Sequence, residues 1–272
     1  APSGGNSPYT YQWQQSEDNV TFKNVTGATL RNYSPPALTK TTYFRLLQTS
    51  ASGCGTLTTN VVTVNVYPQF VAGSVTGDQV ICNNTVPATL TATVPSGGNL
   101  PFTYQWQRSV NNTIFSNITG ATSLEYSPPA LTSTTWFRLV QYSASGCGSL
   151  YTNIVTITVK PSLVAGSVLS DQIICYNNTP VVLTGVEPSG GSEPYSYLWQ
   201  SSTDNDDYIN IIGATSLNYS PSALTSTTYF RQVQISGGGC GSVTTNMVTM
   251  TVYPQFVAGS ISSSQTICYN TE

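Results

Sequence analysis

Residues 102–107 read Phe-Thr-Tyr-Gln-Trp-Gln, and this stretch decides the fold class. Apolar and polar residues alternate along it, which is typical of a β-strand with one buried face. Phe102, Tyr104 and Trp106 are therefore expected to point inward and the three residues between them outward. No segment of the chain shows sustained helical periodicity, so the sequence predicts an all-β protein.

The same strand occurs three times at a fixed step. Trp13, Trp106 and Trp199 are each 93 residues apart. The cysteines keep this step in two series: Cys54, Cys147 and Cys240 in one, and Cys82, Cys175 and Cys268 in the other. Such a period in a β-like sequence indicates tandem domains. A unit of this length fits an Ig-like β-sandwich, which needs about 100 residues.

The period sets the expected domain borders. We predict an Ig-like repeat lacking its first two strands (residues 1–67), complete repeats at 68–160 and 161–253, and the first strand of a further repeat at 254–272. The joints between them contain proline and apolar residues, which favours semi-rigid connections. We therefore expect the domains to run head to tail as an elongated rod.

Composition excludes several classes of function. Only 7% of the 272 residues are charged, there is no histidine, and the formal net charge is −3. Eight Lys and Arg residues cannot form the basic face of a nucleic-acid binder. No apolar run approaches the roughly 18 residues of a membrane span, so membrane insertion is not expected. The expected partners are neighbouring repeats of the same chain, with weak, multivalent contacts to surface glycans or other cell-surface components.

Catalytic and metal-binding motifs are not found in the sequence. There is no histidine for general-base work, no paired carboxylate motif, and no nucleophile or phosphate-binding motif. We predict no enzyme activity, no cofactor and no metal. Asp204, Asp206 and Asp207 form the densest acidic cluster, but the aligned residues are Asn111, Thr113 and Ile114. A solvated loop is the favoured interpretation over a calcium site.

The recurring aromatic residues are predicted to be structural. Trp13, Trp106 and Trp199 are expected in the core, against the alternative of a glycan-stacking platform. Tyr43, Trp136 and Tyr229 open a later strand in a pattern resembling a tyrosine corner, and we predict that they also belong to the core.

One arginine recurs in each unit of this nearly uncharged chain. Arg45, Arg138 and Arg231 would be carboxylate or sulfate clamps on a ligand-binding reading. The favoured alternative is an arginine on an exposed strand face, with its side chain lying over aromatic neighbours.

Six cysteines at repeating positions indicate disulfides and an oxidising compartment, against the alternative of six buried free thiols. Pairing within one unit joins Cys82 to Cys147 and Cys175 to Cys240, and leaves Cys54 and Cys268 to partners outside the fragment. Pairing across the unit boundary joins Cys54 to Cys82, Cys147 to Cys175 and Cys240 to Cys268. We favour the first, because closing a span of 65 residues contributes roughly 4 kcal/mol on the chain-entropy model.

The repeat resembles a known class of surface proteins in a set of short motifs. These are residues 8–14 (PYTYQWQ), 27–29 (GAT), 33–35 (YSP), 38–45 (LTKTTYFR), 53–54 (GC) and 60–64 (NVVTV). They are similar to the Ig-like tandem repeats of very large Bacteroidetes cell-surface proteins, including SprB-type gliding-motility adhesins. The resemblance implies an extracellular, cell-surface location, export by the type IX secretion system and a role in long surface filaments.

The expected function is that of a non-catalytic stalk or adhesin repeat. It would project a binding region or adhere weakly through many copies, with gliding motility as one setting. Two alternatives stay open: an array of carbohydrate-binding modules attached to a secreted enzyme, and a subunit of a polymeric extracellular filament.

Overall fold

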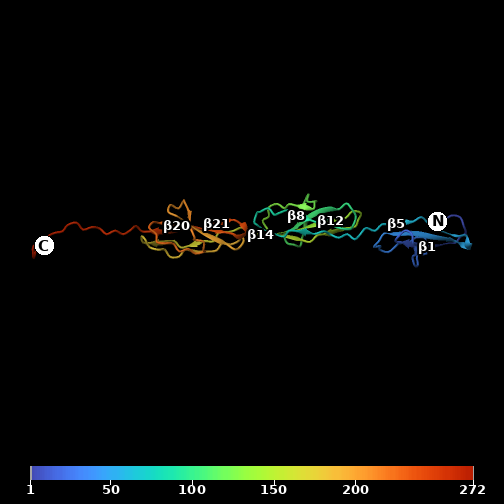
Figure 1. Cartoon of the computed structure of the whole chain (residues 1–272), viewed down its shortest axis with the longest axis horizontal. Coiled ribbons are helices and arrows are strands. Elements are labelled where there is room, and N and C mark those ends of the chain that lie inside the picture. The colour runs from blue at the N-terminus through green and yellow to red at the C-terminus, as the bar shows by residue number, and fades with distance from the viewer. Residues whose placement is uncertain (1, 272) are drawn as a thin grey trace. The chain divides into compact units, whose positions relative to one another are not determined.

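The computed structural model describes residues 2–271, and these residues form an all-β protein. Twenty-two strands and two single-turn 3₁₀ helices are assigned to these residues. Several of the strands are labelled in Figure 1. Among the described residues, no helix has the length and apolarity needed to cross a membrane. Cis peptide bonds precede Pro8, Pro101 and Pro194, which are separated by the 93-residue period.

The strands recur in each 93-residue repeat. The first repeat (1–67) contains β1 (Tyr9–Ser16), β2 (Lys23–Asn24), β3 (Thr42–Ser50), η1 (Ala51–Gly53), β4 (Thr56–Thr58) and β5 (Val62–Val64). The middle repeat (68–160) contains β6 (Val75–Thr76), β7 (Gln79–Cys82), β8 (Leu90–Ala92), β9 (Thr103–Ser109), β10 (Ser116–Asn117), β11 (Glu125–Tyr126), β12 (Thr135–Tyr142), β13 (Ser149–Tyr151) and β14 (Val155–Lys160). The third repeat (161–253) contains β15 (Val168–Leu169), β16 (Gln172–Ile174), β17 (Thr184–Gly185), β18 (Ser196–Ser202), β19 (Ile209–Asn210), β20 (Thr228–Ile235), η2 (Gly237–Gly239), β21 (Ser242–Thr244) and β22 (Val248–Val252).

Internal contacts divide the chain into two compact units. One contains residues 1–78, 88–127 and 136–156, and the other contains residues 79–87, 128–135 and 157–272. The border runs through the sequence of the middle repeat. Its segment 79–87, which carries Cys82, belongs to the same unit as the whole third repeat.

The third repeat shows the complete architecture. Its large sheet has the order β16-β22-β20-β18-β19, and β21 also pairs with β20. All these pairs are antiparallel except β16 with β22, where Gln172 lies opposite Met250. The second layer contains β15 and β17, and an isolated bridge joins Leu183 to Tyr219. These two layers form an Ig-like β-sandwich.

Alternating residues from both layers fill the core of this sandwich. The fully buried members include Trp199 on β18, Met250 on β22 and Leu183 beside β17. Each occupies the inward position of a period-2 pattern, so the next residue along the strand is more exposed. Burying aromatic and branched side chains in this way is the main term that stabilises the fold.

The first unit repeats the same pairings. In the first repeat the order is β2-β1-β3-β4, with β5 also paired to β3. In the middle repeat β9 pairs antiparallel with β10 and β12, and β12 pairs with β13. Its second layer has the order β11-β8-β6.

A buried glutamine bridges two segments in both complete repeats. Gln141 on β12 is fully buried, accepts a hydrogen bond from the Gly73 N–H (2.7 Å) and donates to the Thr93 carbonyl (2.8 Å). Gln234 on β20 makes the same two bonds, with the Gly166 N–H and the Val186 carbonyl, both at 2.8 Å. A Cβ at Gly73 would collide with the Thr93 carbonyl oxygen, so this close approach requires glycine.

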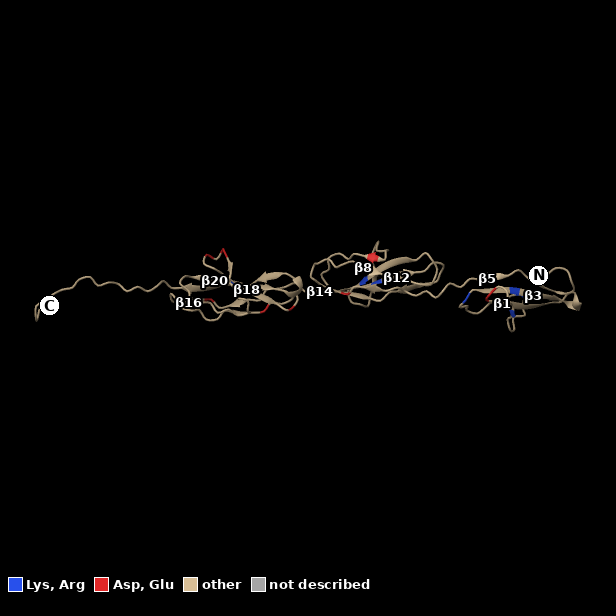
Figure 2. Ribbon diagram, in the orientation of Figure 1, with Lys and Arg blue, Asp and Glu red and all other residues tan. Residues whose placement is uncertain are grey.

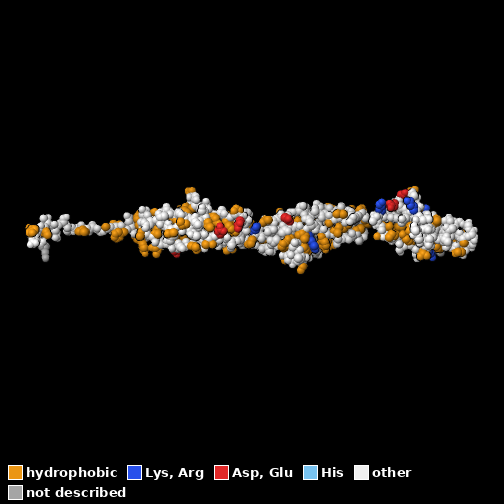
Figure 3. Space-filling view, turned by 90° about the horizontal axis from the view of Figure 1, so that it is seen from below, with side chains coloured by type: hydrophobic (Ala, Val, Ile, Leu, Met, Phe, Trp, Pro, Cys, Tyr) orange, Lys and Arg blue, Asp and Glu red, His pale blue; other side chains and the backbone are white. Residues whose placement is uncertain are grey.

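The surface is largely polar and nearly uncharged. Figure 2 shows the few acidic and basic residues as short coloured stretches of an otherwise tan ribbon, in line with a charged content of 7%. On the face shown in Figure 3, apolar side chains lie interspersed with uncharged polar ones. One ion pair is found among the described residues, between Lys40 and Glu17 at 3.3 Å, and both side chains are exposed.

Residues 254–271 contain no assigned strand. The segments equivalent to residues 265–268 are β7 and β16, and each pairs in parallel with the last strand of its own repeat. No such partner strand follows residue 253 within the part of the chain that the structure describes. The prediction that 254–272 is the first strand of a further repeat therefore stays a prediction, and residue 272 lies outside the described residues.

Candidate functional site

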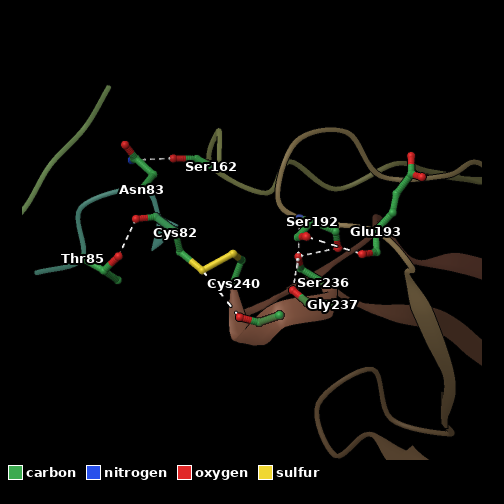
Figure 4. The surroundings of a disulfide bond; sticks show 10 residues. Cys82, Asn83, Thr85, Ser162, Ser192, Glu193, Ser236, Gly237 and Cys240 are labelled. Atoms are coloured by element: carbon green, nitrogen blue, oxygen red, sulfur yellow. Dashed lines mark hydrogen bonds between the residues drawn. A yellow bond between two sulfur atoms is a disulfide. The ribbon is translucent and has the colours of Figure 1, made fainter. Parts of the chain in front are cut away.

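A disulfide bond joins Cys82 to Cys240, with a Cα–Cα distance of 5.2 Å and a sequence separation of 158 (Figure 4). Cys82 is the last residue of β7 in the middle repeat, and Cys240 follows η2 in the third. Asn83 Nδ2 donates to Ser162 Oγ (2.8 Å) beside the bond. The Cys82 Sγ also lies 3.9 Å from the Gly238 carbonyl oxygen. This cysteine junction therefore links one repeat to the next.

The predicted pairings Cys82–Cys147 and Cys175–Cys240 are wrong. Parallel pairing of β16 with β22 places Cys175 beside the C-terminal end of β22. β20 runs antiparallel to β22, so Cys240, which follows β20, lies at the opposite end of the same repeat. Eight residues of β20 at about 3.3 Å each span roughly 26 Å, far more than the Cα separation that a disulfide tolerates.

The alternative pairing of Cys54 with Cys82, and its equivalents, is also wrong, since Cys82 is bonded to Cys240. The remaining cysteines are free thiols. Cys54, Cys175 and Cys268 are exposed, and Cys147 is half-buried. The prediction that Cys54 and Cys268 have partners outside the fragment is not tested.

Two of the three predicted core tryptophans are fully buried. Trp106 and Trp199 have no exposed surface, and each indole N–H donates to a backbone carbonyl 17 residues further on. Trp13 makes the equivalent bond to Leu30 but is only half-buried. The strands described in the first repeat form one sheet, whereas the middle repeat also has the opposing layer of β6, β8 and β11.

The prediction of core positions for Tyr43, Trp136 and Tyr229 is wrong in detail. All three are half-buried, whereas the next residue in each strand is a buried phenylalanine. Because side chains alternate along a strand, the first residue shares the outer face with the arginine two positions later. The inner position is held by Phe44, Phe137 and Phe230.

Each recurring arginine lies over an aromatic ring on the outer sheet face. The guanidinium carbon of Arg138 lies 4.1 Å from the ring centroid of Phe115 and 4.0 Å from that of Tyr151. Arg45 lies over Phe22 and Arg231 over Tyr208, at 3.9 and 3.7 Å. Burial raises the pKa of Tyr208, and the charge of Arg231 opposes this.

The same arginines also form hydrogen bonds with the neighbouring strand. The Nε of Arg138 donates to Gln107 (2.8 Å), and the Gln107 amide donates to Asn117 (2.8 Å). The first and third repeats contain the same chain of bonds at the same distances. The arrangement matches the structural interpretation of these arginines and uses the Nε–H and the amide in internal bonds.

The acidic cluster is a capped loop between β18 and β19. Asp204 accepts hydrogen bonds from the Ser202 hydroxyl (2.7 Å) and from the N–H groups of Asp206 and Asp207 (2.9 and 3.0 Å). These bonds, led by that of Ser202, lower the pKa of Asp204 from 3.8 to about 2. Asn111 makes the same contacts in the middle repeat. Asp18 does so in the first, where the Ser16 hydroxyl contributes most to a pKa well below the usual range.

Asp78 and Asp171 also have structural partners. The carboxylate of Asp78 accepts from the Thr156 N–H (2.7 Å), and that of Asp171 accepts from the Thr249 N–H (2.8 Å). Each fixes the start of the last strand of its repeat. Within residues 2–271, no three His, Cys, Asp or Glu side chains come close enough to hold a metal ion.

The recurrence of this framework agrees with a match to one protein family. The model described as Domain of unknown function (DUF8696) matches residues 1–68, 71–161 and 164–254. The chain belongs to the DUF8696 family. The three matched segments lie close to the repeat borders expected from the 93-residue period.

This DUF8696 chain is similar to several solved structures, each at low sequence identity. Three N-terminal domains of the highly immunogenic outer capsid protein (Hoc) of bacteriophage RB49 match at 12% identity, covering 91% of this chain and 89% of theirs, with a TM-score of 0.44. Domains A168–A170 of titin match at 14% identity, covering 89% and 88%, with a TM-score of 0.42. The fibronectin(III)-like modules of Clostridium thermocellum CbhA match at 11% identity, covering 68% and 90%, with a TM-score of 0.28. No curated protein matches the chain.

Sequence reasoning missed two recurring features of the DUF8696 repeat. One is the bridging glutamine, Gln141 or Gln234, whose signal is a glutamine that recurs at the 93-residue step, four residues after the recurring phenylalanine of the same strand. The other is the pair of aromatic rings that pack in a row with each tryptophan. Trp106, Tyr126 and Phe137 form an aromatic row with centroids 5.9 Å apart, and both other repeats contain the same row.

Proposed function

We propose that this DUF8696 chain is a non-catalytic structural segment of a secreted cell-surface protein. It holds a binding region away from the cell or adheres weakly through many copies. The observation that carries the proposal is what recurs at the 93-residue step: aromatic rows, bridging glutamines, stacked arginines and cysteines. These groups build and connect sandwiches, and none of them forms a reactive arrangement of nucleophile and base.

Internal bonding of the polar side chains supports this proposal. Among the described residues, every buried side-chain nitrogen or oxygen has a hydrogen-bond partner. A binding or catalytic pocket normally keeps a few convergent polar groups for its ligand. In each repeat, the recurring arginine and glutamine are instead bonded to each other.

The disulfide supports an extracellular location, because such bonds persist mainly in oxidising compartments. A gliding-motility adhesin of the SprB type, exported by the type IX system, is the finer assignment that the sequence motifs favour. The expected partners are neighbouring repeats and, weakly, surface glycans.

A glycan-binding comparison tests the proposal. The soluble chain and beads coated with it at increasing density are applied to the same glycan array. We expect negligible binding by the soluble chain and density-dependent binding by the beads, because multivalency amplifies weak contacts.

Submicromolar binding by the soluble chain would instead identify a carbohydrate-binding module. Tyr151 is 54% exposed beside Arg138, and it is the residue to vary in that event. Loss of tight binding in Tyr151→Ala, with retention in the control Leu57→Ala, would place the glycan on the outer sheet face.

A further inference from the structure

Arg138 in the middle repeat differs from the other recurring arginines, because an aromatic ring contacts it from each side of its strand. Phe115 comes directly before β10, on the β9 side of β12, and Tyr151 lies on β13, on the other side. Their ring centroids lie 4.1 and 4.0 Å from the guanidinium carbon. The positions equivalent to Tyr151 are Thr58 and Thr244, so neither Arg45 nor Arg231 has a second ring at this place.

The bonding of Arg138 leaves one edge of its guanidinium without a protein partner. Its Nε donates to Gln107 (2.8 Å), and no hydrogen bond from its Nη atoms is found among the described residues. The ion pair of the described residues joins Lys40 to Glu17, so Arg138 has no carboxylate beside it. Two rings and Gln107 occupy the rest of the group, so a ligand can approach at the Nη edge.

The same contacts fix the direction of this edge. Stacking on the rings of Phe115 and Tyr151 and the bond to Gln107 hold the long side chain in one geometry, which lowers the entropy cost of binding. A planar guanidinium presents parallel N–H groups that fit the two oxygens of a carboxylate. The arrangement therefore suits a ligand with a carboxylate group.

Two exposed tyrosines lie next to this arginine on the outer sheet face. Tyr151 is 54% exposed and Tyr142 is 39% exposed. Tyr151 lies opposite Val140, so side-chain alternation places it on the same face as Arg138 and Tyr142. Tyr142 and Tyr151 are diagonal neighbours, within reach of a single ligand. Their electron-rich ring faces suit the apolar C–H groups of a sugar ring.

We propose that the outer face of the middle repeat binds acidic glycans. The carboxylate of a sugar acid lies on the Nη edge of Arg138, and the sugar rings pack on Tyr151 and Tyr142. This inference rests on the proposed function, because it names the ligand class and the residues of the weak glycan contacts. A glycan is favoured over an acidic peptide, because a sugar acid carries its carboxylate on a ring that two tyrosines can contact.

NMR titration of the whole chain tests the proposal, since it detects weak binding in solution. The Nε–H signals of Arg45, Arg138 and Arg231 are compared, because all three donate to a glutamine at 2.8 Å. The acidic probes are oligogalacturonate, hyaluronan oligosaccharides and oligosialic acid. The controls are their methyl esters, which lack the charge, and oligoglutamate, which lacks the sugar.

We expect at least one acidic oligosaccharide to shift the Arg138 signal and to leave those of Arg45 and Arg231 nearly unchanged. Its methyl ester should bind about tenfold more weakly, because a charge-assisted hydrogen bond is lost. No shift at Arg138 with any acidic probe would overturn the proposal, as would equal shifts at all three arginines. Equally tight binding of oligoglutamate would assign the site to acidic peptides instead.

Variants at exposed positions test the named residues. Tyr151→Thr introduces the residue of the other repeats and should weaken binding about fivefold, whereas the control Leu57→Ala should not. Arg138→Gln should abolish the preference for the acid over its methyl ester, a change that a purely structural arginine would not produce. Retention of that preference would overturn the assignment of the carboxylate to Arg138.

A gain of binding in the first repeat provides a test that does not depend on damaging the site. Thr49→Tyr with Thr58→Tyr introduces both tyrosines beside Arg45, which already lies over Phe22. The Arg45 signal should then respond to the same acidic oligosaccharide. A silent Arg45 in this variant would contradict the role of the tyrosines.

The bead assay separates this inference from the proposed function. Beads coated with Arg138→Gln should lose density-dependent binding to acidic glycans. If they bind as well as beads coated with the unaltered chain, weak adhesion stands and its assignment to Arg138 fails. If beads of the unaltered chain bind no glycan while the Arg138 signal still shifts, the adhesive role fails and the acidic-glycan site stands.

Discussion

Several recurring neighbours hold the indole of Trp106 in place. Its N–H donates to the Ser123 carbonyl (2.9 Å), its ring packs against Tyr126, and the side chain has no exposed surface. On the same repeat, Trp136 is half-buried on the outer face. The two tryptophans therefore differ in burial although both recur as aromatic positions.

We expect Trp106→Ala to lower the stability of the middle repeat by about 3–5 kcal/mol, because it empties a large aromatic site. Trp136→Ala is the matched control and should cost clearly less. Hydrogen exchange of peptides from residues 68–160 localises the loss to this repeat. Equal losses of stability in the two variants would contradict the prediction, because the cost of the substitution would then not depend on the burial of the tryptophan.

Burial of the tryptophan could be predicted from alternation alone, since residues 102–107 follow a strict period of two. The outer position of Tyr43, Trp136 and Tyr229 could not be predicted as easily. Each is followed directly by phenylalanine, so two aromatic residues compete for the inner face. Only the register of β12 with β9 settles which one points inward. Leu139 lies opposite the buried Trp106, and Phe137, two residues before Leu139, shares its face.

At the scale of elements, the bridging glutamine connects segments far apart in the sequence. Gln141 satisfies the Gly73 N–H and the Thr93 carbonyl together, on opposite sides of one amide. A leucine of similar size would fill the space but leave both backbone groups without this partner.

Gln141→Leu should therefore lower the stability of the middle repeat by about 1–3 kcal/mol, the usual cost of leaving such groups unpaired. Gln48→Leu is the control, because the first repeat contains no residues equivalent to Gly73 and Thr93. It should be close to neutral when thermal unfolding and local hydrogen exchange are compared. If Gln141→Leu left the stability of the middle repeat unchanged, the glutamine bridge would not stabilise the fold.

The capped loops respond differently to acid. Asp204 has a pKa of about 2 against an ordinary value of 3.8, so its loop is fully stabilised above pH 4. That contribution is lost as the pH falls through 2, because protonation removes the charge that accepts three hydrogen bonds. Asn111 makes the same bonds without titrating.

Amide chemical shifts of Asp206 and Asp207 should therefore titrate with a midpoint near pH 2, whereas those of Thr113 and Ile114 should not follow it. Asp204→Asn should abolish the transition in the third repeat and keep the loop conformation. A midpoint near pH 4 would mean that the three hydrogen bonds do not persist in solution.

At the scale of the whole molecule, the period and the sandwich fold follow from spacing and alternation. The connectivity of the cysteines does not. It depends on the parallel pairing of β7 with β14 and of β16 with β22, and nothing in the residues of a short strand specifies the direction of its partner. The strand order excludes a disulfide within the core of a single repeat.

The head-to-tail rod is a prediction that solution scattering can test. Nearly identical joints should give an elongated particle with a rise of about 40 Å per repeat, from strands of about eight residues plus loops. The Cys82→Ser variant is the control, because it lacks the disulfide bond between the middle and third repeats. A compact particle with folded-back repeats would contradict the rod.

The bond between Cys82 and Cys240 also determines how the chain carries tension. A pull on the two ends passes from residue 82 to residue 240 through the S–S bond, since this is the shortest covalent path between them. The intervening stretch, with a sequence separation of 158, bears no load while the bond is intact. When the bond is reduced, this stretch bears the load, and its unfolding adds contour length on the order of 500 Å. The oxidation state of this one bond therefore determines whether the stretch between residues 82 and 240 can lengthen under tension.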